Sequence, residues 1–370
     1  MFKKYDTKNT KKITKDEMKN SFILGDRVDA LKTIPDESID IIFTSPPYNV
    51  KKTYDINEDG LTYDEYLDWL YETWEECKRV LVDGGRFILN IPMTITYQKG
   101  YKHITADSVK QFEKLGFTLM GEAIWDKGNV TSRTAWGSFK SPSAPYLVQP
   151  YEMVLIFGKN GRKLKGDKEF ADITKEEFIN YSYSMWKVRP ETAKHKDHPA
   201  PFPRELVYRV LKFFSFEGNT VLDPFSGTGT TAQVANLTNR NFVYIDNSEK
   251  YLNWAKEQIE NNVDNKELIN FEPKGKINIL GVKISEKEFN KLVEQSNKLI
   301  KLNNKRASFL TIDEDKKEEY KELLNITEKY NDILLKKKIT LTESALLDDI
   351  CNETSNKAAE LYLKYYKMTK

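Results

Sequence analysis

A stiff polar loop follows the first strongly apolar run of the chain. The run is Ile39-Asp40-Ile41-Ile42-Phe43, and the loop is Thr44-Ser45-Pro46-Pro47-Tyr48. Two successive prolines fix their own φ angles and lack N–H donors, so such a loop is extended and leaves its carbonyls free. A planar base can lie against the Tyr48 ring while the Ser45 hydroxyl and the Pro46 carbonyl accept hydrogen bonds from an amino group. The pattern indicates chemistry on the exocyclic amine of a nucleic-acid base, or else a proline-stiffened turn whose tyrosine covers the core.

A glycine-rich turn between a short apolar strand and a helix-like stretch is the second signal. It reads Thr220-Val221-Leu222-Asp223-Pro224-Phe225-Ser226-Gly227-Thr228-Gly229-Thr230-Thr231-Ala232. Glycines are needed where the backbone approaches a ligand closely or where φ is positive. The next apolar strand ends in Asp246, an acid well placed for a ribose diol. The glycine spacing also fits a dinucleotide fingerprint, but hydride transfer has no use for an amine-handling loop. An adenosyl cofactor that carries a methyl group accounts for both motifs.

Together the two motifs resemble those of the β group of S-adenosylmethionine-dependent DNA amino-methyltransferases. In that group the catalytic motif precedes the cofactor motif, as it does here. Three further segments are similar to the family's motifs: Leu24-Gly25-Asp26, Leu81-Val82-Asp83-Gly84-Gly85-Arg86-Phe87 and His198-Pro199-Ala200-Pro201-Phe202-Pro203. The resemblance covers roughly residues 20 to 262.

The resemblance implies S-adenosylmethionine as cofactor and assigns residues to two sites. The catalytic residues would be Ser45, Pro46, Pro47 and Tyr48. The cofactor-binding residues would be Gly25, Asp26, His198, Phe202, Asp223, Pro224, Phe225, Gly227, Gly229, Thr230 and Asp246. For His198, a capping or packing role is an equally good interpretation.

Strand and helix patterns alternate along the first two thirds of the chain. We expect strands at 21–24, 39–43, 86–91, 118–125, 152–157, 220–223 and 241–246, and helices at 63–81, 104–115, 204–214 and 232–237. This order predicts an α/β, doubly wound sheet, which the resemblance makes a Rossmann-like methyltransferase sheet with circularly permuted motif order. Ligands bind such sheets at the carboxyl ends of the strands, where both motifs fall. The aromatic stripe Tyr66, Leu70 and Trp74 is expected in the core.

Composition changes divide the chain into three parts. Residues 1–20 are polar and expected to be disordered or loosely packed. Residues 21–263 form the expected catalytic domain. In residues 264–370 glycine becomes scarce and Lys, Glu, Asn and Leu dominate, with helical periodicity at 283–302, 313–336 and 342–367. This helical C-terminal region could serve DNA recognition, dimerisation or capping of the domain.

Two segments of the catalytic domain are expected to contact DNA, at 126–150 and 158–190. The first is long for a connection and the second begins with a basic run. Basic side chains on glycine-bearing loops suit phosphate contacts, although a solvated surface loop has the same composition. The candidate DNA-binding residues are Arg133, Lys140, Lys159, Arg162, Lys163 and Lys165.

Composition excludes several other activities. The net charge of the 370 residues is only +2, so a DNA surface must be a local patch. Methylation of cytosine at ring carbon 5 needs a cysteine nucleophile, usually after proline, and Cys77 and Cys351 follow Glu76 and Ile350. The three histidines show no metal-ligand spacing, so we expect no metal and no zinc-dependent deamination. Free cysteines, no membrane-length apolar stretch and no signal-peptide core predict a cytoplasmic protein.

The expected mechanism rotates the target base out of duplex DNA and stacks it on Tyr48. Ser45 and the Pro46 carbonyl then take the two amine hydrogens out of the ring plane. This localises the nitrogen lone pair, which attacks the methyl group in line. In the family, Ser at the position of Ser45 is commoner in enzymes that act on cytosine N4, and Asp is usual for adenine N6. Cytosine N4 is therefore the first expectation and adenine N6 the second.

Other substrates and partners are also open at this point. Pro-Pro-Tyr elements resemble those of enzymes that methylate RNA amines or protein glutamine, a remoter alternative. A non-catalytic DNA-binding relative would be expected to lack Tyr48 or the glycines, and both are present. The family usually serves restriction–modification, which implies double-stranded DNA as partner and a cognate restriction endonuclease. The expected state is a monomer or homodimer.

Overall fold

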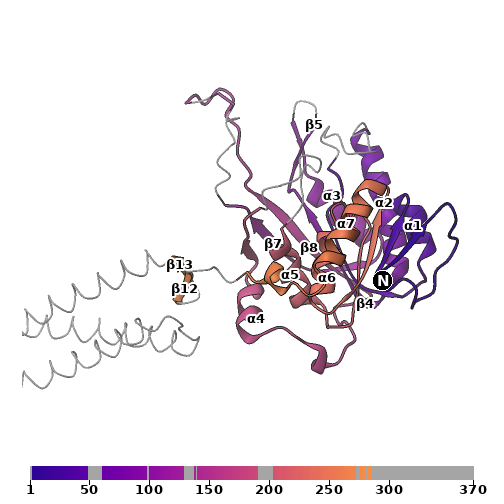
Figure 1. Cartoon of the computed structure of the whole chain (residues 1–370). Helices are drawn as coiled ribbons and strands as arrows, with labels where there is room; N and C mark the ends of the chain where they lie inside the picture. The colour runs from indigo at the N-terminus through magenta and orange to yellow at the C-terminus, as the bar shows by residue number, and fades with distance from the viewer. Residues whose placement is uncertain are drawn as a thin grey trace, which may run out of the picture. The chain divides into compact units, whose positions relative to one another are not determined.

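The computed structural model describes residues 2–48, 61–97, 100–128, 137–138, 140–190 and 203–271, and the backbone of 276–279 and 282–285. The chain forms two compact units, residues 1–270 and 271–370 (Figure 1). In the second unit the described residues form one antiparallel hairpin, β12 (Lys276–Ile279) and β13 (Val282–Ser285). None of the described helices is long and apolar enough to cross a membrane.

A nine-stranded mixed sheet forms the centre of the first unit. In spatial order its strands are β1 (Lys3–Asp6), β2 (Ser21–Leu24), β11 (Asn241–Asp246), β10 (Thr220–Asp223), β3 (Ile39–Thr44), β4 (Leu81–Ile91), β8 (Tyr151–Lys159), β7 (Phe117–Asp126) and β9 (Met185–Lys187). The first six strands are parallel, and β8 is antiparallel to both β4 and β7. We call the edge where β2, β3, β4, β10 and β11 end the carboxyl edge, and the opposite one the amino edge. Because β8 is reversed, it begins at the carboxyl edge, where β7 ends.

Helices cover both faces of the sheet. One buried cluster joins α1 (Arg27–Thr33), α2 (Tyr63–Val80) and α3 (Ile104–Lys114) to one face, and another joins α5 (Arg204–Phe214), α6 (Thr230–Leu237) and α7 (Glu249–Asn261) to the other. Neighbouring strand residues alternate between the two clusters, as Ile41 and Ile42 do. The expected doubly wound α/β fold is confirmed. The unit also contains α4 (Lys175–Ser182), the hairpin β5 (Ile95–Tyr97) and β6 (Gly100–Lys102), and the 3₁₀ turns Lys168–Phe170 and Lys266–Ile269.

Local sequence explains where the longest described helix begins and which side of it is buried. Thr62 and Glu65 form a capping box at the start of α2, so two backbone N–H groups that lack helical partners are satisfied. The stripe of Tyr66, Leu70 and Trp74 is buried against the sheet, as the spacing predicts. The chain passes from Val80 directly into β4.

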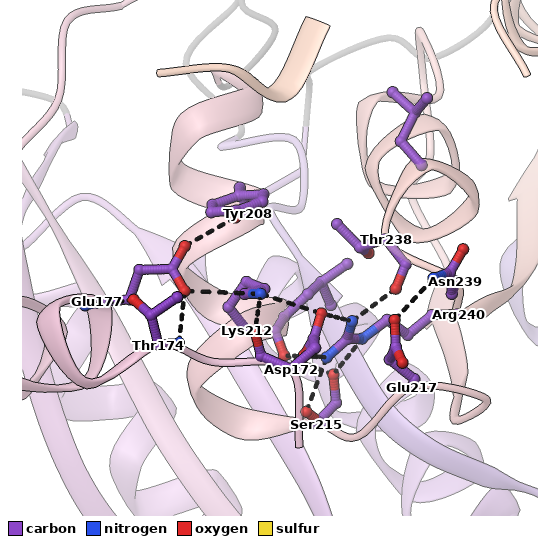
Figure 2. A network of polar contacts seen from close by, with 12 residues as sticks. Asp172, Thr174, Glu177, Tyr208, Lys212, Ser215, Glu217, Thr238, Asn239 and Arg240 are labelled. Carbon is purple, nitrogen blue, oxygen red and sulfur yellow. Dashed lines mark hydrogen bonds and ion pairs between the residues drawn. The ribbon is translucent and has the colours of Figure 1, made fainter. Parts of the chain in front are cut away.

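A network of ion pairs joins the segment around α4 to α5 and to the start of β11, at the amino edge (Figure 2). The fully buried Arg240 side chain donates to both carboxylate oxygens of Asp172, at 2.6 and 2.7 Å. It also donates to the hydroxyl and the carbonyl of Ser215. Lys212 Nζ lies 3.1 Å from Asp172 Oδ2 and 3.6 Å from Glu177 Oε2. We call Asp172, Glu177, Lys212, Ser215 and Arg240 the amino-edge network.

Residues 1–20 are not loosely packed, so this expectation was wrong for the described part, residues 2–20. Lys3–Asp6 adds a parallel strand beside β2, and Ile13 and Met18 are 4% and 1% exposed. The sequence pattern does not predict this strand, because it is short, polar and at the outer edge of the sheet, where it packs little apolar surface.

The end of the first unit also differs from the expected boundary at residue 263, because the unit continues to Asn270. Ile269, in the 3₁₀ turn after α7, packs against the buried cluster of α5, α6 and α7. The helices expected at 313–336 and 342–367 lie outside the described residues. So does most of the one expected at 283–302, whose first residues, 283–285, belong to strand β13.

Candidate active site

The two sequence motifs meet at the carboxyl edge, where the connections of the sheet diverge. From β10 the chain passes through α6 to β11 on one side, and from β3 it passes through α2 to β4 on the other. Such a switch point is the usual ligand site of a doubly wound sheet. Thr44 Oγ1 donates to Asp223 Oδ1 at 2.7 Å, which joins the motifs across 179 positions of sequence.

Residues 45–48, the expected catalytic loop, follow β3 as a half-buried segment held by hydrogen bonds; we call them the catalytic loop. Ser45 Oγ lies 2.7 Å from the Tyr48 hydroxyl. Pro46 is buried, and the carbonyl of Pro47 accepts a 2.7 Å hydrogen bond from Tyr66 of α2. Tyr66 therefore supports the loop in addition to its place in the core.

Two polar side chains from neighbouring strands, Asn90 of β4 and Glu152 of β8, contact the catalytic loop, and a lysine pairs with the second of them. Glu152 Oε2 accepts from the Tyr48 hydroxyl at 3.1 Å and from Asn90 Nδ2 at 2.6 Å. Lys127 pairs with Glu152 Oε1. Burial, and secondarily the Glu152 charge, raises the pKa of Tyr48 well above its ordinary value, so Tyr48 keeps its proton. We call Ser45, Tyr48, Asn90, Lys127 and Glu152 the carboxyl-edge cluster.

The glycine turn has the backbone that its sequence requires. Gly227 and Gly229 have φ of 49° and 77°, in the left-handed region. A Cβ at Gly229 would lie 2.6 Å from Cβ of Ala255, so α7 packs directly on the turn. Gly229 is the N-cap of α6, and Thr230 is the first helical residue. The turn thus brings bare backbone to the carboxyl edge, which fits a cofactor lying close to it.

The buried Asp223 carboxylate joins several elements at the carboxyl edge by hydrogen bonds. Asp223 is 2% exposed, and its carboxylate accepts from Thr44 Oγ1, from Thr231 Oγ1 at 2.8 Å and from Phe225 N at 3.1 Å. Burial raises its pKa to about 6. The structure therefore places Asp223 behind the turn as a clamp between β3, β10 and α6, and Pro224 beside it is also buried.

Two further expected cofactor segments, that of Asp246 and that of Gly25 and Asp26, lie at the same edge. Asp246 Oδ2 accepts from Gly227 N at 2.9 Å, and its carbonyl accepts from Gly25 N at 3.0 Å. Asp26 caps α1 through Val28 N and pairs with Arg27 at 2.9 Å. The ends of β2, β10 and β11 are thus linked by direct hydrogen bonds.

An aromatic wall lies next to the glycine turn. The Phe225 ring centroid is 5.3 Å from that of Trp69, and the Arg27 guanidinium carbon lies 3.8 Å from the Trp69 ring centroid. The Tyr66 ring stacks with that of Trp69 at a centroid distance of 6.1 Å. A flat adenine ring is compatible with such a wall.

The first expected DNA segment leaves the carboxyl edge, as a role beside the site requires. It follows β7 and returns to β8, and its base is closed by Lys127 N, which donates to the Pro150 carbonyl at 2.9 Å. Its described part extends away from the sheet (Figure 1) and exposes Lys140 and Tyr146. Arg133, His198 and Phe202 lie outside the described residues.

The second expected DNA segment, 158–190, returns to the carboxyl edge only at its end, where β9 runs parallel to β7. Its basic run follows β8, which ends at the amino edge because it runs antiparallel to β4. Lys159 is 7% exposed, donates to the Leu81 carbonyl at 2.6 Å and is not available to a phosphate. The described run of Arg162, Lys163 and Lys165 is exposed there and does not adjoin the catalytic loop. The expected position of the basic run beside the catalytic loop was wrong, because the sequence does not show in which direction β8 runs.

Several side chains of the candidate site were not expected from the sequence. Asn90 and Glu152 each interrupt an apolar strand, and one polar residue inside such a run is the signal that could have found them. Lys127 and Trp69 carry no comparable signal. Among the residues that the structure describes, no group of three or more His, Cys, Asp or Glu could hold a metal ion.

Comparison with known proteins agrees with this geometry. Residues 39–257 match the family model of N6 and N4 methylases, described as DNA methylase. The chain is 42% identical over 164 residues to the type II methyltransferase M.MjaVI of Methanocaldococcus jannaschii, which covers 44% of this chain and 84% of that protein. It is 29% identical over 249 residues to the DNA adenine methyltransferase YhdJ of Escherichia coli, over 63% and 80% of the two chains.

Solved structures give the same result. TTHA0409 of Thermus thermophilus, a putative DNA modification methylase solved with S-adenosyl-L-methionine, is 30% identical, with a TM-score of 0.54 over 66% of this chain and 94% of that one. The cytosine-N4-specific PvuII DNA methyltransferase, at 20% identity and a TM-score of 0.51 over 67% and 92%, shares the fold. The chain therefore belongs to the N6/N4 DNA methylase family, the S-adenosylmethionine-dependent DNA amino-methyltransferases.

Proposed function

We propose that this methyltransferase modifies the N4 amine of cytosine in duplex DNA. The observation that carries the proposal is Ser45 at the end of β3. Its neutral hydroxyl stands where relatives that act on adenine usually have a carboxylate, and it lies 2.7 Å from the Tyr48 hydroxyl. A hydroxyl can accept one amine hydrogen without adding a charge to the site.

In this proposal each residue of the catalytic loop has a separate role in methyl transfer. The cofactor, when bound, supplies a methyl group on a sulfonium. Tyr48 stacks on a cytosine that has been rotated out of the duplex, at a cost of a few kcal/mol. Ser45 Oγ and the Pro46 carbonyl accept the two amine hydrogens and turn the nitrogen lone pair out of the ring plane. Placement of the amine supplies most of the rate effect.

The carboxyl edge provides the place for the cofactor beside this loop. We propose that the turn of Gly227 and Gly229 lies under the methionine part, that Asp246 binds the ribose, and that Gly25, Asp26, Phe225 and Trp69 surround the adenine. The support is that these residues meet where β2, β10 and β11 end, next to the hydrogen bond between Thr44 and Asp223. The His198 segment and Phe202 complete the site in this proposal.

We propose that DNA approaches over the carboxyl edge. The segment after β7, with Arg133 and Lys140, would contact its phosphates. The described part of that segment extends away from the sheet after the end of β7, at the carboxyl edge (Figure 1). The basic run after β8 has no part in this proposal, because it lies at the amino edge.

The biological setting is proposed from the relatives. The type II methyltransferase named above suggests a restriction–modification system, in which methylation protects host DNA from a cognate endonuclease in the same cytoplasm. Adenine N6 is the second candidate, because the E. coli relative is named a DNA adenine methyltransferase.

Nucleoside analysis tests the proposal. The purified chain is incubated with isotope-labelled S-adenosylmethionine and genomic DNA from a host without DNA methyltransferases, and the digested nucleosides are separated by mass spectrometry. We expect label in N4-methylcytosine. Label in N6-methyladenine would show that Ser45 does not choose the base, and label that enters only RNA or protein would refute DNA as the substrate.

A further inference from the structure

The carboxyl-edge cluster contains an ion pair that the methyl-transfer scheme does not use. Glu152 and Lys127 come from β8 and from the residue after β7, and their side chains are 11% and 16% exposed. Burying a charged pair has a desolvation cost. The pair directly adjoins the catalytic loop, because Glu152 accepts from Tyr48.

The hydrogen bonds in this cluster can run in only one direction. Glu152, ionised beside Lys127, only accepts, so the single Tyr48 hydrogen goes to Glu152 Oε2. The raised pKa of Tyr48 keeps that hydrogen in place. The Tyr48 oxygen can then only accept, so Ser45, 2.7 Å away, must donate its own hydrogen to it. Asn90 Nδ2 donates to the same Ser45 oxygen at 3.4 Å, so one lone pair of Ser45 is left for a partner outside the chain.

We infer that Glu152, fixed by Lys127, is a positioning residue that makes Ser45 a hydrogen-bond acceptor for the target amine. The inference rests on the proposed role of Ser45 in holding that amine. Asn90 supports the same arrangement, since its Nδ2 group donates to Glu152 at 2.6 Å and lies 3.4 Å from both hydroxyls. Without Glu152 the two hydroxyls could exchange donor and acceptor roles, and Ser45 could present its hydrogen to an amine that itself needs acceptors.

The isosteric variant Glu152→Gln should reverse the direction of the hydrogen bonds from Ser45 through Tyr48 to residue 152. Lys127 will attract the new amide oxygen, so the amide NH₂ faces Tyr48 as a donor. We expect the single-turnover rate of methyl transfer to fall roughly tenfold to a hundredfold, the usual range for a lost or misdirected buried hydrogen bond. Cofactor and DNA affinity should stay unchanged.

Tyr48→Phe provides a second test that leaves the ion pair intact. It keeps the stacking ring but removes the hydroxyl between Glu152 and Ser45, so its loss should match that of Glu152→Gln. The double variant should be no slower than either single variant, because both act on one chain of hydrogen bonds. Glu122→Gln and Tyr183→Phe, both exposed, are matched controls expected to keep the wild-type rate.

The experiment measures single-turnover transfer of labelled methyl groups to unmethylated genomic DNA, with cofactor affinity by calorimetry as the check on folding. Equal losses that do not multiply support the inference. A wild-type rate for Glu152→Gln overturns it, and so do losses that multiply in the double variant. The cytosine proposal is tested separately, by the methylated nucleoside that the wild-type protein produces. The rates of the variants relative to wild type are expected to be the same whether the target is cytosine N4 or adenine N6.

Discussion

Buried carboxylates paired with lysine or arginine occur at both edges of the sheet, yet the two sites are built differently. In the amino-edge network, Arg240 and Lys212 direct their donors to Asp172, Glu177 and backbone carbonyls (Figure 2). In the carboxyl-edge cluster, the row of hydrogen bonds that begins at Glu152 passes through Tyr48 and ends at the Ser45 hydroxyl. In the same cluster, Asn90 Oδ1 is buried with no hydrogen-bond partner. A network whose hydrogen-bonding groups are paired within the protein holds helices in place. A row of hydrogen bonds with unpaired acceptors can instead bind a substrate.

The largest expected effect is on stability at the amino edge. Arg240→Met should lower the free energy of unfolding by about 3 kcal/mol, because it leaves the buried Asp172 carboxylate short of donors. Urea unfolding measures the loss, and Arg162→Met, at an exposed arginine, is the control. Methyl transfer per folded molecule should not change. A stability equal to that of wild type would show that the network contributes nothing to the fold.

Tyr48→Ala should have the largest effect on activity. Removal of the stacking ring should slow methyl transfer roughly a hundredfold, with cofactor affinity little changed. Single-turnover assays and calorimetry measure the two quantities. Turnover at the wild-type rate would remove Tyr48 from the site.

Asp246→Ala should act on cofactor affinity instead. Its carboxylate accepts from Gly227 N, so its loss loosens the glycine turn as well as the proposed ribose contact. We expect the dissociation constant of S-adenosylmethionine to rise on the order of tenfold by calorimetry. An unchanged constant would mean that Asp246 does not contact the cofactor.

A smaller effect should appear in the pH dependence of stability. Burial alone would raise the pKa of Asp172, but hydrogen bonds and charge from Arg240, with the charge of Lys212, lower it. The resulting stabilisation is present above the unfolded pKa and is lost as the pH falls through the lower, folded pKa. The stability difference between wild type and Asp172→Asn should therefore shrink between about pH 6 and about pH 3 in urea titrations. A difference that grows toward acid would contradict the pairing.

The smallest effect is expected from the basic run. Replacement of Arg162, Lys163 and Lys165 by Ala should change DNA affinity by less than about twofold, because these side chains lie at the edge away from the proposed DNA path. Lys140→Ala, on the segment that leaves the carboxyl edge, is the comparison and should weaken binding more. Fluorescence anisotropy at two salt concentrations measures both. A strong loss in the triple variant would mean that DNA reaches the amino edge.

The elements that the sequence predicts well are those with strong periodicity. The apolar runs give β3, β10 and β11 almost to the residue, and the helical spacing gives α2 and α5. The catalytic loop and the glycine turn follow directly from Pro46, Pro47 and the two glycines, because few other functions need those residues in that order.

The missed features depend on which distant residues meet. Asp223 has the motif position of a cofactor ligand, and its carboxylate also accepts hydrogen bonds from Thr44 and Thr231, contacts that the sequence does not predict. The contact of Glu152 with Tyr48 becomes visible only when β8 pairs in reverse beside β4 and brings its first residues to the carboxyl edge. The same reversal carries Lys159 away from the site. Strand direction, which single-sequence patterns do not record, accounts for what the sequence missed at Glu152 and Lys159.

The most direct test of this comparison applies one isosteric change to each buried carboxylate. Single-turnover methyl transfer to unmethylated genomic DNA is measured for Glu152→Gln and Asp172→Asn, each corrected for the folded fraction. We expect Glu152→Gln to be roughly tenfold to a hundredfold slower, with Asp172→Asn at the wild-type rate but less stable. Equal rates in the two variants would contradict the division between a site-serving cluster and a structural network.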